Sequence, residues 1–369
     1  MSRARDFADL AGSADAGGLT GRNLIINGAM TVAQRGSLTG QTGTVYTACD
    51  RFLSAEVGDT VTTSTQDTDV PSGQGFANSL KIDVTTADAS LAASDVFLVM
   101  TRLEGQDLQH LLYGTSDAKN LTLSFWVKSP KTGTHIAELF QNDATYYNSQ
   151  AYTIASANTW QKVELTFSGY TATAFDDDNG YSLGITWFLA AGSDYTSGTL
   201  SSNTWHNTQA NRAVGQVNCV DDAANNFYIT GVQLEVGETA TPFEHRSYGD
   251  ELRRCQRYLY MLDATSSAGD ENTPVFREGA TAAQLTYYLP TNLRATPSIV
   301  GSNYGRVVGY NTSFSVSAAS VSAMAVRTNI NDGQKIDINL THASLAGSYV
   351  FGHHDRSGES GTLYFEAEL

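Results

Sequence analysis

The sequence predicts an all-β protein, in which a larger β-sandwich is followed by a short helix and a second, smaller β-sandwich. Three observations support this prediction. Apolar residues repeat at every second position, clusters of turn-forming residues separate the repeats, and the composition combines 33 Gly and only 6 Pro with 18 Tyr and 15 Phe. At 369 residues the chain is long enough for two or three domains.

Residues 22–246 are expected to form the larger sandwich. Turn signals at 130–133 and 178–180 separate its strands. About eight to ten short strands over this length are typical of a β-sandwich. The clearest alternating segments are 121–127, 163–167, 183–189 and 228–236.

A different period appears at residues 247–262, which are expected to form an amphipathic helix that links the two sandwiches. Ser247 and Asp250 are spaced as in a capping box, and apolar residues then recur every three or four positions. Such a stripe can pack against copies of itself around an axis or against its own sandwich. The candidate seam for oligomerisation consists of Tyr248, Leu252, Cys255 and Leu259.

Alternation resumes in residues 263–369, which are expected to form the C-terminal β-sandwich. At the other end, residues 1–21 are polar and Gly-rich and hold too few apolar residues to fold alone. We expect this first segment to be an anchor to a larger assembly.

Charge and composition exclude several classes of partner. The formal net charge is −16, whereas binding to a phosphate backbone needs a contiguous positive surface, so nucleic acid is not an expected partner. No segment is apolar enough for a secretory signal or for membrane insertion. Three widely spaced Cys argue against a disulfide framework and favour buried thiols in a protein that folds in a reducing cytoplasm.

The usual signatures of enzymes are missing from the sequence. It contains no nucleotide-binding glycine loop, no HExxH, no GxSxG and no CxxC, so we expect no enzyme, no cofactor and no metal. The acidic run 176–180 lacks the ligand spacing of an EF-hand and is expected to be a turn. His353 and His354 are adjacent, so on a strand they would point to opposite faces and could not share a metal.

Aromatic residues are the best candidates for ligand contacts. Trp187 shares a face with apolar residues and is expected in the core, whereas Trp126 should lie on the outer face of a sheet or under a neighbouring chain. Trp205, Tyr146 and Tyr147 lie among Asn, Asp and Ser in expected loops, which suits either sugar recognition or an interface between chains. A second candidate contact is the expected hairpin tip with His353, His354 and Asp355.

Several segments resemble the jelly-roll carbohydrate-binding modules that bind xylan and glucan. They are Asn23-Leu24-Ile25-Ile26-Asn27-Gly28, 121–129, 160–163 and 228–235. The resemblance covers roughly residues 22–243 and implies a jelly-roll fold. In that family, acidic residues after the Asn-Gly and in the closing strand help to hold a structural calcium. Here those stretches read Ala29-Met30-Thr31 and Thr230-Gly231, which departs from the calcium pattern.

The whole chain also resembles bacteriophage tail fibre proteins of the marine phage type. The residues that carry this resemblance are 2–6, 20–30, 240–249, 255–258 and 293–297. It implies a homotrimer in the virion tail, attached to other tail proteins through residues 1–21, that binds the host cell-surface polysaccharide. Two alternatives are a glycan depolymerase and a head or baseplate decoration protein without a ligand.

Overall fold

The computed structural model describes residues 21–263, 275–277, 281–301, 306–310, 316–331, 335–342, 349–354 and 362–369. The protein is mostly β-structure, with two large antiparallel sheets packed as a sandwich. The chain divides into two compact units: unit 1 contains residues up to Glu251 together with Leu369, and unit 2 contains Leu252–Glu368. The expected anchor, residues 1–21, lies outside the described residues except for Gly21.

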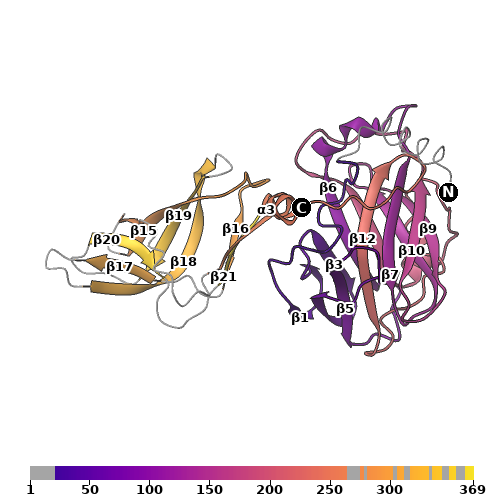
Figure 1. Ribbon diagram of the computed structural model, residues 1–369, viewed down its shortest axis with the longest axis horizontal. Helices are drawn as coiled ribbons and strands as arrows, with labels where there is room; N and C mark the ends of the chain where they lie inside the picture. The colour runs from indigo at the N-terminus through magenta and orange to yellow at the C-terminus, as the bar shows by residue number, and fades with distance from the viewer. Residues whose placement is uncertain are drawn as a thin grey trace. The chain divides into compact units, whose positions relative to one another are not determined.

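Unit 1 consists of two six-stranded antiparallel sheets, which Figure 1 shows as stacked layers. Sheet A has the strand order β1-β4-β5-β12-β7-β10, and sheet B has the order β2-β3-β6-β11-β8-β9. The strands are β1 Leu38–Gln41, β2 Thr44–Tyr46, β3 Phe52–Val57, β4 Val61–Asp67, β5 Ser79–Thr86, β6 Val96–Glu104, β7 Leu121–Lys128, β8 Gly133–Gln141, β9 Tyr146–Ile154, β10 Gln161–Phe167, β11 Tyr181–Ala191 and β12 Asn226–Val236.

The core of unit 1 lies between the two sheets. Because side chains alternate along a strand, every second residue of each strand points inward. Trp187 of β11 is completely buried there, as expected, and packs edge-on against Phe125 of β7 with ring centroids 5.6 Å apart. All three cysteines are buried and none forms a disulfide, which confirms the prediction of buried thiols.

The segments between strands contain four short helical turns. They are η1 Gly105–Asp107, η2 Gln109–Leu111, α2 Ser193–Thr196 and η3 Gln209–Asn211. The last two belong to the long connection between β11 and β12, which contributes to the functional site described below.

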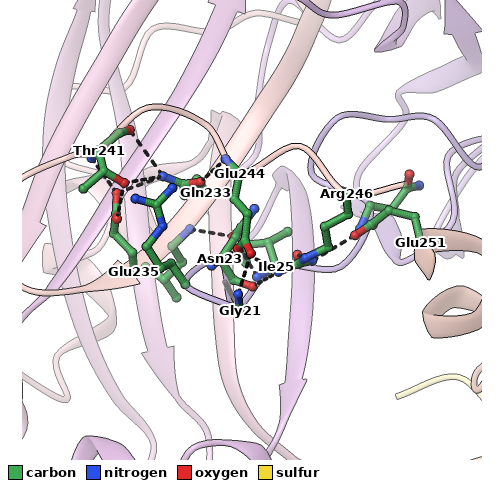
Figure 2. Close-up of polar contacts among 12 residues, drawn as sticks. Gly21, Asn23, Ile25, Gln233, Glu235, Thr241, Glu244, Arg246 and Glu251 are labelled. Carbon is green, nitrogen blue, oxygen red and sulfur yellow. Dashed lines mark hydrogen bonds and ion pairs between the residues drawn. The ribbon is translucent and has the colours of Figure 1, made fainter. Parts of the chain in front are cut away.

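The opening segment of unit 1 is tied to the segment that leaves it, as Figure 2 shows. The backbone N–H groups of Gly21 and Asn23 donate to the two carboxylate oxygens of Glu244. The guanidinium of Arg246 donates to the carbonyl oxygen of Ile25 and to Glu251, each at 2.9 Å. Burial acts to raise the pKa of Glu244. The backbone hydrogen bonds from Asn23 and Gly21 and the charge of Arg246 outweigh this effect, so the pKa lies below its ordinary value.

A second group in Figure 2 orders the segment after the closing strand β12. Glu235 is buried and accepts hydrogen bonds from Gln233 and from both the backbone N–H and the hydroxyl of Thr241. Gln233 in turn accepts from the backbone N–H of Glu244 at 2.8 Å. Buried polar groups of this kind stabilise a fold only when they are paired, and here they fix the path of the chain as it leaves the sandwich.

The predicted helix is shorter than expected. Helix α3 runs from Tyr248 to Gln256, and the chain then enters strand β13, Leu259–Asp263. The hydroxyl of Ser247 accepts a hydrogen bond from the backbone N–H of Asp250. Ser247 therefore caps the N-terminus of the helix, as predicted. The prediction that the helix extends to Leu259 was wrong. The spacing of Leu259 from Cys255 suits a helix, but Leu259 is buried on strand β13, which pairs with β21, the last strand of the chain.

The described residues of unit 2 form a three-stranded sheet of order β13-β21-β16 and a six-stranded sheet of order β14-β15-β19-β18-β17-β20. Tyr287 of β15 packs edge-on against Phe365 of β21, with centroids 5.6 Å apart, so side chains of the two sheets meet. The strands are β14 Val275–Arg277, β15 Ala282–Tyr288, β16 Ser298–Gly301, β17 Arg306–Tyr310, β18 Val316–Asn331, β19 Lys335–His342, β20 Tyr349–His354 and β21 Thr362–Glu366.

Candidate functional site

The outer face of sheet B carries a row of aromatic side chains. Phe140 of β8 is directly opposite Gly184 of β11 on one side and Tyr147 of β9 on the other. Gly184 is in turn opposite Arg102 of β6. The neighbours of these residues along each strand point into the core, so the row lies on the opposite side of sheet B, where Phe140 is half-buried and Tyr147 is only 8% exposed. Four adjacent strands at about 4.8 Å spacing place Arg102 about 14 Å from Tyr147, and the aromatic positions on three of these strands span about 10 Å.

Tyr181 completes the row because Gly184 leaves space for it. A Cβ atom at Gly184 would lie 2.2 Å from the Tyr181 hydroxyl and 3.2 Å from its ring. The Tyr181 ring therefore covers a position where every other amino acid would clash. This close approach explains why glycine occurs in the middle of β11. We refer to Tyr181, Phe140 and Tyr147 as the aromatic row.

The three rings of the aromatic row contact one another in sequence. Phe140 is stacked on Tyr147 with ring centroids 5.0 Å apart and planes 17° from parallel, and it meets Tyr181 edge-on at 6.1 Å. A guanidinium lies at each end: Arg102 is 4.8 Å from the Tyr181 ring and Arg212 is 4.0 Å from the Tyr147 ring. Contacts of this kind stabilise the rings in one orientation.

Arg212 also forms the buried ion pair of this face. Its guanidinium donates to both carboxylate oxygens of Glu138, with the shortest contact at 2.7 Å, and the Ser149 hydroxyl donates to the same carboxylate. The Glu138 side chain is completely buried and that of Arg212 is 12% exposed. Burial lowers the pKa of Arg212, but the charge of Glu138 outweighs it and raises the pKa above its ordinary value. The Arg212 guanidinium therefore remains charged.

The connection between β11 and β12 covers the other end of this face. Tyr195, Leu200 and Ala213 pack there with Leu98 and Phe188, which point outward from β6 and β11. Residue His206 continues this cover along the edge of sheet B, where its backbone exchanges two hydrogen bonds with Tyr147. Arg212 thus lies at the boundary between the covered end of the face and the aromatic row.

The predicted ligand residues Tyr146 and Tyr147 do not lie in a loop but begin strand β9, so they point to opposite faces. Tyr147 joins the aromatic row. Tyr146 instead packs on the core beside Tyr170, with centroids 5.0 Å apart, and Trp205 packs 5.1 Å from the same ring. The indole N–H of Trp205 donates to the carbonyl of Ser168 at 2.7 Å. Trp205 and Tyr146 are therefore brought together, but away from the face that carries Tyr147.

The remaining predicted residues are distributed over other parts of the chain. Trp126 lies half-buried on the outer face of sheet A, as expected. His353 and His354 end strand β20, where they pair with β17, and adjacent positions on a strand face opposite ways. Their side chains and the whole of Asp355 lie outside the described residues.

The candidate seam is also divided by the structure. Cys255 and Leu259 are buried within the single chain, whereas Tyr248 is 60% exposed and Leu252 is half-buried. Only Tyr248 and Leu252 are thus accessible for contact between chains.

The described residues contain neither a metal-ion cluster nor a helix that could span a membrane. Within those ranges no set of three His, Cys, Asp or Glu side chains is arranged to hold a metal ion. Over the same part of the chain, no helix has the length and apolar character needed to cross a bilayer. In the acidic run 176–180, the Asp178 carboxylate accepts the backbone N–H of Gly180, as in a turn.

Five residues of this face were not predicted from the sequence: Phe140, Tyr181, Arg102, Arg212 and Glu138. The segment that forms β8 does not alternate between apolar and polar residues, because Ile136 shares the outward side with Glu138 and Phe140, so no local signal marks these two residues. No local pattern relates Arg212 to Glu138, which is 74 residues away. Their pairing depends on the path of the long connection.

Comparisons with known proteins found similarity only among solved structures. No protein-family model matches the chain, and no curated protein matches it. The enzymatically active domain of tailspike protein 4 from bacteriophage CBA120 has 14% identity and a TM-score of 0.30 over 58% of this chain. That match spans only 21% of the tailspike chain.

Other similar structures are carbohydrate-binding modules. The family 11 module of the cellulosomal cellulase Lic26A-Cel5E from Clostridium thermocellum has 13% identity and a TM-score of 0.27, covering 55% of this chain and 99% of the module. TmCBM61, solved with β-1,4-galactotriose, has 10% identity and a TM-score of 0.30, covering 58% of this chain and 99% of that chain. Likeness at this level assigns no function.

Proposed function

We propose that this protein is a virion attachment protein, a tail fibre whose first β-sandwich binds a bacterial surface glycan through the aromatic row of sheet B. The observation that carries the glycan part is the arrangement of Tyr181, Phe140 and Tyr147 as adjoining rings between two guanidinium groups. The tail fibre part is supported by the resemblance of the sequence to tail fibre proteins.

The chemistry of the row suits a sugar chain. The carbon-bound hydrogens of a pyranose form an apolar face that packs on an aromatic ring, and its hydroxyl groups need donors and acceptors close to the ring edge. Tyr181 provides a hydroxyl, which contacts the sulfur of Met100, and Arg102 provides a guanidinium beside it, which donates to the carbonyl oxygen of Leu369. A surface about 14 Å long, from Arg102 to Tyr147, suits an extended oligosaccharide better than a single sugar.

The proposal is tested by retardation of the protein in gels that contain purified bacterial lipopolysaccharide or capsule. We expect retardation by at least one of these glycans and a loss of at least tenfold in affinity in Phe140→Ala. The control is Phe76→Ala, which removes a ring that packs with Phe243 rather than with the aromatic row. Circular dichroism and thermal unfolding of both variants separate loss of binding from loss of the fold.

Two outcomes would reject the glycan proposal. If Phe140→Ala remains folded and binds as tightly as the unaltered protein, the aromatic row is not the binding surface. If no surface glycan retards the protein, the alternative of a decoration protein without a ligand is favoured. Appearance of new reducing ends after incubation with the glycan would instead favour the depolymerase.

The virion setting is tested separately. Antibody labelling of particles should place the chain on the tail, and labelling of the head would reject the tail fibre. The mass in solution should be about three times 39.6 kDa for a homotrimer. We expect Leu252→Asp to dissociate that trimer, because a charge would then be buried between chains. An unchanged mass in this variant would show that Leu252 is not part of the interface.

A further inference from the structure

The outer face of sheet A carries a second group of aromatic residues, which are half-buried. In β12, Tyr228 is directly opposite Lys128 of β7 on one side and Lys81 of β5 on the other. Trp126 is two residues before Lys128, so both share the outer face. Trp160 directly precedes β10. The first residue of β10, Gln161, pairs with Val127, which is next to Lys128 in β7. We call Trp126, Lys128, Trp160, Tyr228 and Lys81 the sheet A platform.

Lys128 holds two rings of the platform in place. Its ammonium lies 4.2 Å from the centre of the Tyr228 ring and 5.6 Å from that of Trp160, and the two rings meet edge-on at 6.1 Å. Asp69 binds the same ammonium and accepts the Trp160 indole N–H at 2.8 Å. Lys128 is 10% exposed, so this arrangement is organised before any ligand arrives.

Each lysine of this face is paired with an acid. Lys128 is paired with Asp69, Lys81 with Asp83 at 3.2 Å, and Lys162, which is opposite Trp126, with Glu164 at 2.7 Å. The charges within each pair cancel, and the carboxylate of Asp67, which acts electrostatically on Lys81 and Tyr228, adds negative charge beside the platform. Side by side, an ammonium and a carboxylate can donate to and accept from neighbouring hydroxyl groups.

A face that served only to solvate the sheet would not need these aromatic residues. Trp126, Trp160 and Tyr228 are all half-buried and accessible on the side opposite the core, and two of the four Trp of the chain are among them. In the described part of the chain Trp126 stacks on no other ring, and it lies between Thr230 and Lys162 of the adjoining strands. Its indole is therefore available to a ligand.

We propose that the sheet A platform is a second glycan-binding surface, and that its ligand is an uncharged polysaccharide. Trp126 supplies a ring for the apolar face of a sugar, and the lysine–carboxylate pairs bind its hydroxyl groups. Because the pairs cancel their charges, an anionic sugar gains no net attraction here. This inference concerns a different surface from the aromatic row, so it stands or fails independently of the proposed function.

The experiment follows the tryptophan fluorescence of the full chain during titration with mixed-linked β-1,3-1,4-glucan, β-1,4-galactotriose and xylohexaose. We expect at least one of these neutral probes to change the emission, with little dependence on salt. We expect Trp126→Ala to weaken that binding at least tenfold and to abolish most of the emission change. Phe140→Ala of the aromatic row should leave this binding within twofold of the unaltered protein.

The matched control is Trp205→Phe, which removes an indole that packs on the core rather than on the sheet A platform. It should retain both the binding and most of the emission change. Because Trp126 contributes little to the core, Trp126→Ala should unfold at nearly the same temperature as the unaltered protein. Should Trp126→Ala fail to fold, Lys162→Ala provides the second variant, with an expected loss of about threefold.

Several results would overturn the inference. They are equal affinity in Trp126→Ala, loss of binding in Phe140→Ala alone, and failure of every neutral probe to change the emission. Binding of heparin but of no neutral probe would show that the ligand class is wrong. A fall in oligomeric mass in Trp126→Ala would show that the platform is an interface between copies of this chain.

Discussion

The two outer faces of the first sandwich use ion pairs and aromatic rings in different ways. On sheet B, Arg212 and Glu138 are almost completely removed from water, and the connecting segment that carries Arg212 covers part of the face. On sheet A, the corresponding pairs are more exposed, with Asp69 at 44% and Glu164 at 51%. The rings of sheet B contact one another, whereas Trp126 on sheet A stacks on no described ring.

The difference teaches that similar residues have different roles according to their burial. An ion pair in water contributes about 1 kcal/mol or less, whereas loss of one partner from a buried pair costs about 3–5 kcal/mol because the other charge remains without compensation. Variants of sheet B pairs should therefore change stability, and variants on sheet A should change ligand binding with little change in stability.

The largest effect is expected from separating the buried pair. Arg212→Ala leaves the Glu138 carboxylate buried with only Ser149 as a donor, and the free energy of unfolding should fall by about 3–5 kcal/mol. Urea denaturation followed by fluorescence measures this change. The double variant Arg212→Met/Glu138→Leu should lose much less, because it removes both charges. If the single and double variants lose equal amounts, the ion pair itself does not organise this face.

A smaller change in the free energy of unfolding is expected on lowering the pH, because His135 on the inner side of β8 has a shifted pKa. This residue is fully buried, and burial lowers its pKa to about 4 although its ring N–H donates to the carbonyl of Lys131 at 3.1 Å. The unfolded chain binds a proton near pH 6.5 and the folded chain does not, so stability should be full above 6.5 and decline towards pH 4. The slope is at most about 1.4 kcal/mol per pH unit.

Urea denaturation between pH 4 and 7 measures the contribution of His135. The dependence of the free energy of unfolding on pH should disappear in His135→Gln. If it persists in that variant, other titrating groups cause it. Asp69 on sheet A provides the comparison. The ammonium of Lys128 and the indole of Trp160 hold its pKa below the ordinary 3.8, so its contribution is present above that pH and is lost only in stronger acid. Asp69→Asn should therefore keep the slope between pH 4 and 6.5.

The smallest effects are expected from the lysines of sheet A. Lys128→Ala removes a cation between two rings and should lower the free energy of unfolding by about 1 kcal/mol. Lys162→Ala removes a more exposed partner, with a side chain 37% exposed, and should change it by less than about 0.5 kcal/mol. Thermal unfolding of both variants measures the difference. A loss above about 2 kcal/mol in Lys162→Ala would contradict the contrast between the two faces.

Much of the fold follows from local patterns in the sequence. The alternation in 121–127 and 183–189 predicted strands whose inward residues are in the core, and the N-cap Ser247 predicted where the helix begins. Local patterns failed at the end of that helix, because the spacing of Leu259 suits a helix as well as the buried strand that it forms with β21. Pairing with a distant strand decided this point.

For the candidate site, the sequence by itself determined that aromatic residues are the candidates for ligand contacts and that Trp126 points away from the core. Tertiary structure alone decided which of them lie together. Tyr146 and Tyr147 separate because the two sides of a strand face different environments, and Arg212 reaches Glu138 because the long connection returns over sheet B. Side-chain period is a local property of the backbone, whereas the pairing of distant strands and connections depends on the packing of the whole sandwich.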